Sequence, residues 1–182
     1  MLLDELMKII QNEFISEIPI LGTGYSAMTT FFNVREQFFI EKTVIFLKGF
    51  ENIDEDFRNK LDKAISEEKY KQDLEERLII ALDRFDELKK ATALFNFFVA
   101  RINNELDHQE FLRYLYVLDK IDFSNIEALR KFYSSTEEVT CDSSLNSFAF
   151  VGLLKLLTKL DVIVFGKNDF GSKFLKILDR LA

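Results

Sequence analysis

Hydrophobic residues recur at three- and four-residue steps along most of the 182-residue chain. This spacing is typical of helices that bury one face in a core. One such run ends near Ser16, and others cover about 54–65, 66–85, 108–121 and 124–133. The periodicity therefore predicts a mainly α-helical protein.

Two further runs are apolar on more than one face, so neighbouring elements are expected to cover them on most sides. The first spans about 26–48 and ends before Gly49, a residue well suited to stop a helix. The second spans about 87–102, where Leu94 and Phe97 flank the main apolar face. The pattern predicts that these two helices pack on each other.

Short polar residues stand where several of these helices are expected to begin. Asp54, Ser66 and Asp86 each precede an apolar run, and such residues can accept a hydrogen bond from the first free backbone N–H groups of a helix. The segments 107–110 and 124–127 carry the residue pattern of a capping box. These five positions are our predicted helix starts.

The chain departs from this helical pattern in its last third. Residues 134–144 are polar and lack periodicity, so a sub-boundary is expected there within an otherwise single helical domain, 1–182. A helix is predicted over about 145–160, and then a short β-branched run at 162–165 and a turn at 166–169 lead into a last helix. We therefore predict a single-domain multi-helix bundle with a short β-hairpin near the C-terminus.

Residues 17–32 combine the only proline with two of the six glycines and carry no charge after Glu17. Gly22 and Gly24 match neither phosphate-loop pattern, because the lysine of one and the third glycine of the other are absent. The uncharged run has about the minimum length of a membrane span, but it holds Pro19 and several polar residues. A tight corner between helices, with Ile18, Ile20 and Leu21 in the core, fits these residues best.

Composition narrows the classes of function. The formal charge of −7 gives no general attraction to nucleic acid or anionic lipid, so binding to either would need a local patch. Cys141 is the only cysteine, which excludes an internal disulfide and a cysteine zinc site. The acidic N-terminus differs from a secretion signal. A cytoplasmic protein is expected.

Three carboxylates in the segment LDRFDELKK at 82–90 are the candidate metal ligands: Asp83, Asp86 and Glu87. Arg84, Lys89 and Lys90 stand among them, and caps and ion pairs on a helix surface explain the same residues. A second acidic stretch, 103–111, is similar to the end of a calcium-binding EF-hand loop. With Glu110 as the last ligand of such a loop, Val99 and Arg101 occupy the first two ligand positions and Asn104 stands at the glycine position. A conventional calcium site is therefore excluded.

Nucleophilic catalysis would have to use the only histidine, His108, with Cys141 or a serine. No serine lies in a Gly-x-Ser-x-Gly motif, and spacing alone does not establish contact between His108 and Cys141. A non-enzymatic protein without a cofactor is therefore the favoured interpretation.

The C-terminal segment is basic. From Leu153 onward six basic residues face three acidic ones, so this segment carries +3 while the remainder carries −10 of the total −7. Its helix, strand, turn and helix pattern resembles the end of a winged-helix domain, which implies binding to nucleic acid, with Lys167 and Lys173 as candidate contacts. The segment that would be the recognition helix, 145–154, is apolar where a groove-reading helix carries polar and basic residues. Core packing is therefore favoured over base reading.

Three segments also resemble small helical proteins of bacteria and phages: IPI at 18–20, FFIEKTVIFL at 38–47 and LDRFDELKKA at 82–91. The middle of the chain is loosely similar to the tellurite-resistance (TerB-like) helical fold, whose acidic clusters have been linked to metal. The Asp-Gly part of that pattern is absent here. The resemblance implies a helical fold more than an activity.

A non-enzymatic protein-binding or regulatory module, encoded by a phage or mobile element, is the function that we expect from the sequence. Aromatic residues beyond those that a core absorbs would form an exposed patch for a protein partner or for self-association. Tyr114 and Tyr116 are the candidates, because they fall on different sides of one helix. The alternatives are a nucleic-acid-binding regulator, a metal-dependent activity at the acidic cluster, and a membrane-active protein using 17–32 and 145–160.

Overall fold

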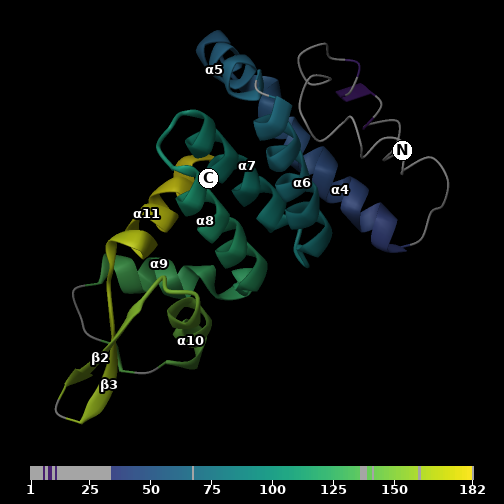
Figure 1. The fold of residues 1–182 in the computed structure, drawn as a ribbon. Helices are drawn as coiled ribbons and strands as arrows, with labels where there is room; N and C mark the ends of the chain where they lie inside the picture. The colour runs from purple at the N-terminus through teal and green to yellow at the C-terminus, as the bar shows by residue number, and fades with distance from the viewer. Residues whose placement is uncertain are drawn as a thin grey trace. The chain divides into compact units, whose positions relative to one another are not determined.

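The computed structural model describes residues 6, 8, 9, 11, 34–66, 68–135, 139–140, 142–159 and 161–181. The described chain is mainly helical and carries a short antiparallel hairpin near the C-terminus, which confirms the predicted fold class (Figure 1). Two compact units divide the chain, Met1–His108 and Gln109–Ala182. The interval 134–144, where a sub-boundary was expected, lies inside the second unit, and a single domain over 1–182 stays a prediction.

Four helices build the described part of the first unit: α4 (Val34–Lys48), α5 (Glu55–Ile65), α6 (Glu68–Arg84) and α7 (Lys89–Ile102). A 3-10 turn, η1 (Gly49–Asn52), follows α4. Both α4 and α5 pack against α6 and α7 (Figure 1). The contact predicted between α4 and α7, the two helices expected to be covered on most sides, is therefore confirmed.

Edge-to-face contacts between phenylalanines form the centre of this unit. Phe46 and Phe50 of the α4–η1 segment meet Phe95 and Phe98 of α7 at ring-centroid distances between 4.9 and 6.0 Å. Gly49 lies between Phe46 and Phe50 in the sequence. A Cβ atom at this position would stand 2.5 Å from the Phe95 ring. Gly49 therefore serves close packing, while the chain continues through it as a 3-10 turn.

The predicted helix starts of this unit have mixed outcomes. Asp54 caps α5, because its carboxylate accepts a hydrogen bond from the Phe57 N–H at 2.8 Å. Ser66, predicted to cap the start of the next helix, is the C-cap of α5, where its hydroxyl donates to the Lys63 carbonyl oxygen. Leu88, not Asp86, is the N-cap of α7, and no side chain caps that end. Asp86 is bound to Lys90 instead.

The second unit contains α8 (His108–Lys120), which begins at the last residue of the first unit, α9 (Ile126–Ser134), α10 (Ser143–Phe150) and α11 (Asp169–Leu178). The short turns η2 (Phe123–Asn125) and η3 (Asp179–Leu181) precede α9 and follow α11. The start of α8 directly after Asp107 agrees with the prediction. The capping box predicted at 124–127 is wrong. Asp122 caps η2 by accepting a hydrogen bond from the Ser124 N–H, and the N-cap of α9 is Asn125, whose side chain makes no capping hydrogen bond.

Three strands accompany these helices: β1 (Val139–Thr140), β2 (Lys155–Lys159) and β3 (Val162–Gly166). They form one antiparallel sheet in the order β1-β3-β2, in which Leu156 pairs with Phe165 and Thr158 with Ile163. The helix predicted over 145–160 is therefore wrong in its second half. Gly152 ends α10 in the left-handed conformation (φ +82°), and the Gly152 and Leu153 N–H groups donate to the Ala149 and Phe148 carbonyl oxygens.

One tyrosine ties the second unit together. The Tyr133 hydroxyl donates to the Leu153 carbonyl oxygen at 2.6 Å and accepts from the Asn168 N–H at 3.2 Å. The Asn168 side chain in turn accepts from the Gly171 N–H at the start of α11. A Cβ atom at Gly171 would overlap both the Leu153 oxygen and the Tyr133 hydroxyl, so only glycine fits there.

Some of the sequence predictions concern residues outside those that the structure describes. The first helix as a whole, the corner at 17–32 and the start of the long helix at 26–33 lie outside the described residues. In the described part of the chain, no helix combines the length and the apolar character that a membrane crossing requires.

Candidate functional site

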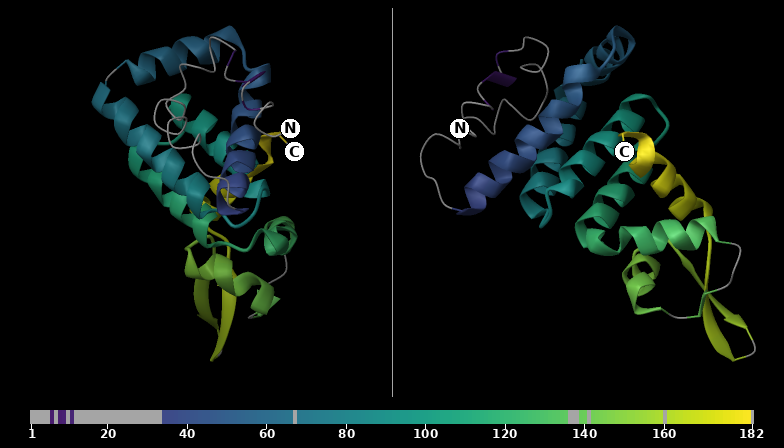
Figure 2. Two further views of the ribbon diagram at one scale, coloured as in Figure 1. Left: turned by 90° about the vertical axis from the view of Figure 1, so that its right-hand side faces the viewer. Right: turned by 180° about the vertical axis from the view of Figure 1, so that it is seen from behind.

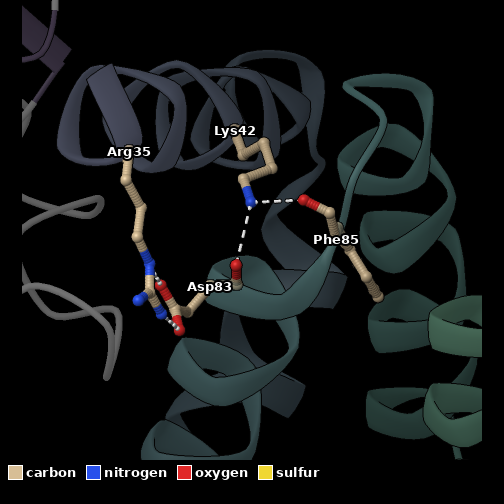
Figure 3. Close-up of polar contacts among 4 residues, drawn as sticks. All are labelled: Arg35, Lys42, Asp83 and Phe85. Atoms are coloured by element: carbon tan, nitrogen blue, oxygen red, sulfur yellow. Dashed lines mark hydrogen bonds and ion pairs between the residues drawn. The ribbon is translucent and has the colours of Figure 1, made fainter.

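Two of the three carboxylates predicted as candidate metal ligands, Asp83 and Asp86, form ion pairs with basic side chains. Asp83, at the end of α6, accepts from Arg35 of α4 at 2.5 and 3.3 Å (Figure 3). Asp86 accepts from Lys90 at 2.6 Å, and this hydrogen bond lowers the pKa of the Asp86 carboxyl. Among the described residues, no three His, Cys, Asp or Glu side chains are placed to hold a metal ion. Asp83 and Asp86 are therefore ion-pair partners, and within the described residues Glu87 belongs to no group of three possible ligands.

Beside this turn, the buried ammonium group of Lys42 contacts the end of α6. Its Nζ donates to the carbonyl oxygens of Phe85 at 2.6 Å and Asp83 at 3.3 Å (Figure 3). It also lies 4.7 Å from the centre of the Phe38 ring. Burial lowers the pKa of Lys42, although Asp83 and Asp86 act in the opposite direction. Lysine is a donor only, so here it satisfies carbonyl groups that a helix end leaves free.

Tyr114 and Tyr116 have different environments in α8. Tyr114 is fully buried, and its ring stacks on Phe170 of α11 with centroids 4.5 Å apart. Its hydroxyl donates to the Phe170 carbonyl oxygen at 3.0 Å. Tyr116 is 51% exposed. Tyr114 is therefore part of the core of the second unit, and Tyr116 alone of the two is available to a partner.

A shallow hollow of about 320 Å³ lies beside Tyr116. Phe150, at the end of α10, borders it and is 82% exposed. Arg113 also lines the hollow, and its guanidinium lies 4.3 Å from the centre of the Phe170 ring. Aromatic and aliphatic groups with one cation thus form a surface suited to an amphipathic partner.

The hairpin carries more exposed large hydrophobic residues than any helix in the described chain. Its exposed large hydrophobic residues are Leu156, Leu157, Val162 and Ile163. Leu156 is 62% and Ile163 51% exposed, whereas Val164 and Phe165 at the base of the hairpin are buried. Both views of Figure 2 show the hairpin extending beyond the helices of its own unit. Val164 and Phe165 of β3 therefore anchor the hairpin in the core, whereas Leu157 and Leu156, which pair with them from β2, are exposed.

Sequence reasoning missed this surface because 155–159 was interpreted as helix. The signal that could have found it is Gly152, which stands where a helix commonly ends in a left-handed residue. A helix ending there leaves residues 155–159 free to pair with the β-branched run of β3.

The two lysines expected to contact nucleic acid have structural partners. Lys167 donates to the Tyr133 carbonyl oxygen at 2.9 Å and to that of Ser135. Lys173 pairs with Glu110 at 2.6 Å. The exposed residues of α10 are Ser143, Asn146 and Phe150, none of which is basic. These contacts favour a packing role for both lysines.

The two residues considered for nucleophilic catalysis are not placed together by any described contact. The imidazole Nε2 of His108 lies 3.8 Å from an Asp73 carboxylate oxygen, within the first unit. Cys141 lies outside the described residues.

No family model, curated protein or solved structure was found to match this chain.

Proposed function

We propose that this protein is a non-enzymatic protein-binding or regulatory module that holds its partner through the β2–β3 hairpin. The observation that carries the proposal is the distribution of exposed apolar side chains. Every exposed large hydrophobic residue in the described chain belongs to the second unit, and four of the six lie on the hairpin. An apolar surface of this kind is typical of a partner site.

The backbone of the hairpin supports the same proposal. In the sheet order β1-β3-β2, strand β2 has a neighbour on one side only among the described residues. An unpaired strand edge presents N–H and C=O groups that a strand of another chain can use. Such strand addition combines backbone hydrogen bonds with side-chain contacts on alternate residues. An extended segment of a partner protein is therefore the occupant that fits this edge.

The apolar side chains are sufficient to control such binding. Complete burial of an exposed leucine or isoleucine contributes about 1.5–3 kcal/mol, so half-exposed residues contribute roughly 1 kcal/mol each. Four of them together could supply roughly 4 kcal/mol, which corresponds to about a thousandfold change in affinity. Two substitutions should therefore have a measurable effect.

Affinity capture from the native host with three forms of the full chain tests the proposal. The forms are the wild type, the double variant Leu156→Thr/Ile163→Thr, and Phe150→Ser as a control. Threonine retains the preference for strands while removing apolar surface. The control removes an exposed aromatic residue from the hollow beside Tyr116, so a loss of recovery in this form alone would place the partner there and contradict the hairpin site. We expect a protein that is recovered with the wild type and the control but at least tenfold less with the double variant.

Equal recovery with all three forms would contradict a hairpin site. Light scattering on the same forms identifies self-association, which is expected to disappear in the double variant only if a second copy occupies the hairpin. Nucleic acid in the eluate, released steeply by salt, would instead support the alternative of a nucleic-acid-binding regulator with a winged-helix-like C-terminal segment.

A further inference from the structure

A second hollow, of about 390 Å³, lies entirely within the first unit. The ends of α5 and α7 and the first turn of α6 surround it. Its described lining residues are Lys60, Lys63, Ala64, Tyr70, Arg101, Ile102 and Asn104. Three of these side chains are cationic and none is acidic, in a chain whose net charge is −7. The hollow is therefore a local basic site on an acidic protein.

Arg101 is the least exposed of the three cations. Its guanidinium lies over the Tyr70 ring, 5.4 Å from the ring centre, and its Nη1 is 3.4 Å from the Leu106 carbonyl oxygen. Its Nε is buried and has no acceptor among the described residues. A buried donor without an acceptor is unfavourable, so a small movement of the guanidinium that brings this nitrogen to a ligand oxygen would favour binding.

The turn after α7 keeps Arg101 in this position. Asn104 adopts the left-handed conformation with φ +58°, which asparagine tolerates better than most residues. The Asn104 N–H donates to the Arg101 carbonyl oxygen and the Glu105 N–H to that of Ala100, at 3.1 and 2.9 Å. These two bonds close the helix end, and the chain then returns to place the Leu106 oxygen near the guanidinium.

The two lysines approach from α5. Lys60 lies between Asp56, at 2.5 Å, and the side-chain oxygen of Asn103, at 3.3 Å. Lys63 is exposed one turn further along the same helix. A planar guanidinium can bind two oxygens of one phosphate, and lysine ammonium groups add charge without a fixed geometry. The combination suits a phosphate group.

We propose that this hollow binds a small phosphorylated molecule, with Arg101 as the fixed contact and Lys60 and Lys63 as the charge partners of its phosphate. A volume of about 390 Å³ exceeds the need of a bare phosphate ion and lies within the range of roughly 300–1,000 Å³ of small-molecule sites. The site is separate from the hairpin and does not depend on the proposed function.

The first test is an NMR titration of the full-length protein with inorganic phosphate at constant ionic strength. The Nε–H resonance of arginine reports on this donor directly, and Arg101→Lys assigns it. We expect a saturable shift of the Arg101 resonance, with backbone shifts confined to 60–64, 70 and 101–104. Chloride at the same ionic strength should give no such shift.

Three substitutions separate a ligand site from a helix-end role of these cations. Lys63→Gln should weaken phosphate binding about 2- to 5-fold, and Asp56→Asn should strengthen it by a similar factor because Lys60 is released. Lys89→Gln, which removes an exposed charge at the start of α7, is the matched control and should have no effect. The hairpin double variant should also bind phosphate normally.

Two results would overturn the proposal. One is a titration in which the Arg101 resonance does not saturate or responds equally to chloride. The other is an equal loss of affinity in Lys63→Gln and Lys89→Gln, which would indicate general charge attraction. If the cations serve only the negative ends of α5 and α7, the substitutions will change the melting temperature but no phosphate-induced shift will occur.

Discussion

Single residues determine how closely the helices of this protein approach. Gly49 and Gly171 stand where a side chain would overlap a phenylalanine ring or a carbonyl oxygen, so packing requires glycine at both. Lys42 joins two helices through hydrogen bonds, because its ammonium group on α4 donates to carbonyl oxygens 41 and 43 residues away, at the end of α6. Asp54 could be predicted as a cap because its partner is three residues away. The partners of Lys42 could not be predicted.

Replacing Lys42 by methionine should destabilise the first unit by about 2 kcal/mol. Methionine retains most of the buried stem but leaves the Phe85 and Asp83 carbonyl oxygens without this donor. Urea denaturation followed by circular dichroism measures the change. Lys89→Met, at an exposed position, should alter the free energy of unfolding by less than about 0.5 kcal/mol. A Lys42→Met protein as stable as the wild type would show that loss of the buried charge compensates for the lost bonds.

At the scale of elements, the β2–β3 hairpin is the proposed partner site. Its base is fixed by the buried residues Val164 and Phe165 and by pairing with β1. Between Lys159 and Val162, which face each other across the hairpin, Asp161 takes the left-handed conformation with φ +63°. Positive φ at this point matches the twist of two-residue hairpin connections. The turn therefore sets the register that exposes Leu156 and Ile163.

Asp161→Val should lower the stability of the hairpin by about 1–2 kcal/mol, because a β-branched residue is strained at positive φ. Asp161→Gly removes the same carboxylate without this strain and is the control. Hydrogen exchange of the β3 amides measures local stability. We expect faster exchange in the valine variant only. Equal exchange in both variants would contradict a conformational role for this residue.

At the scale of the whole molecule, the two units have different surfaces. The first has its centre in a phenylalanine cluster, and its described residues include no exposed large hydrophobic side chain. The second buries Tyr114 against Phe170 and Phe174 and carries every exposed large hydrophobic residue of the described chain. The proposed roles therefore separate, with a small ligand in the first unit and a protein partner in the second.

Alkaline pH should destabilise both units through three tyrosines, of which Tyr114 is buried and Tyr70 and Tyr133 are half-buried. Burial is the main cause that raises the pKa of Tyr70, Tyr114 and Tyr133. Above about pH 10 the unfolded chain releases these protons before the folded protein does, so the free energy of unfolding falls as pH rises. Tyr114 should contribute about 0.5–1 kcal/mol between pH 9 and 11 after allowance for solvent screening.

Urea denaturation of wild type and Tyr114→Phe at pH 9 and 11 measures this contribution. The variant should lose less stability than the wild type over that interval, although it is less stable at pH 9 because it lacks the bond to the Phe170 oxygen. Lys42 has the opposite sign, since burial lowers its pKa, and it is present in both proteins. An equal loss in both proteins would contradict the assignment to Tyr114.

The sequence by itself determined the helical class, the apolar faces of α4 and α7, the Asp54 cap and the β-branched strand at 162–165. Each of these depends on the spacing of apolar residues or on contacts within about four residues, which the order of residues specifies directly. Only the tertiary structure decided that Tyr114 is buried and Tyr116 exposed. It also decided that Asp83 pairs with Arg35 and that Arg101 joins Lys60 and Lys63. Those outcomes depend on segments distant in sequence meeting in space.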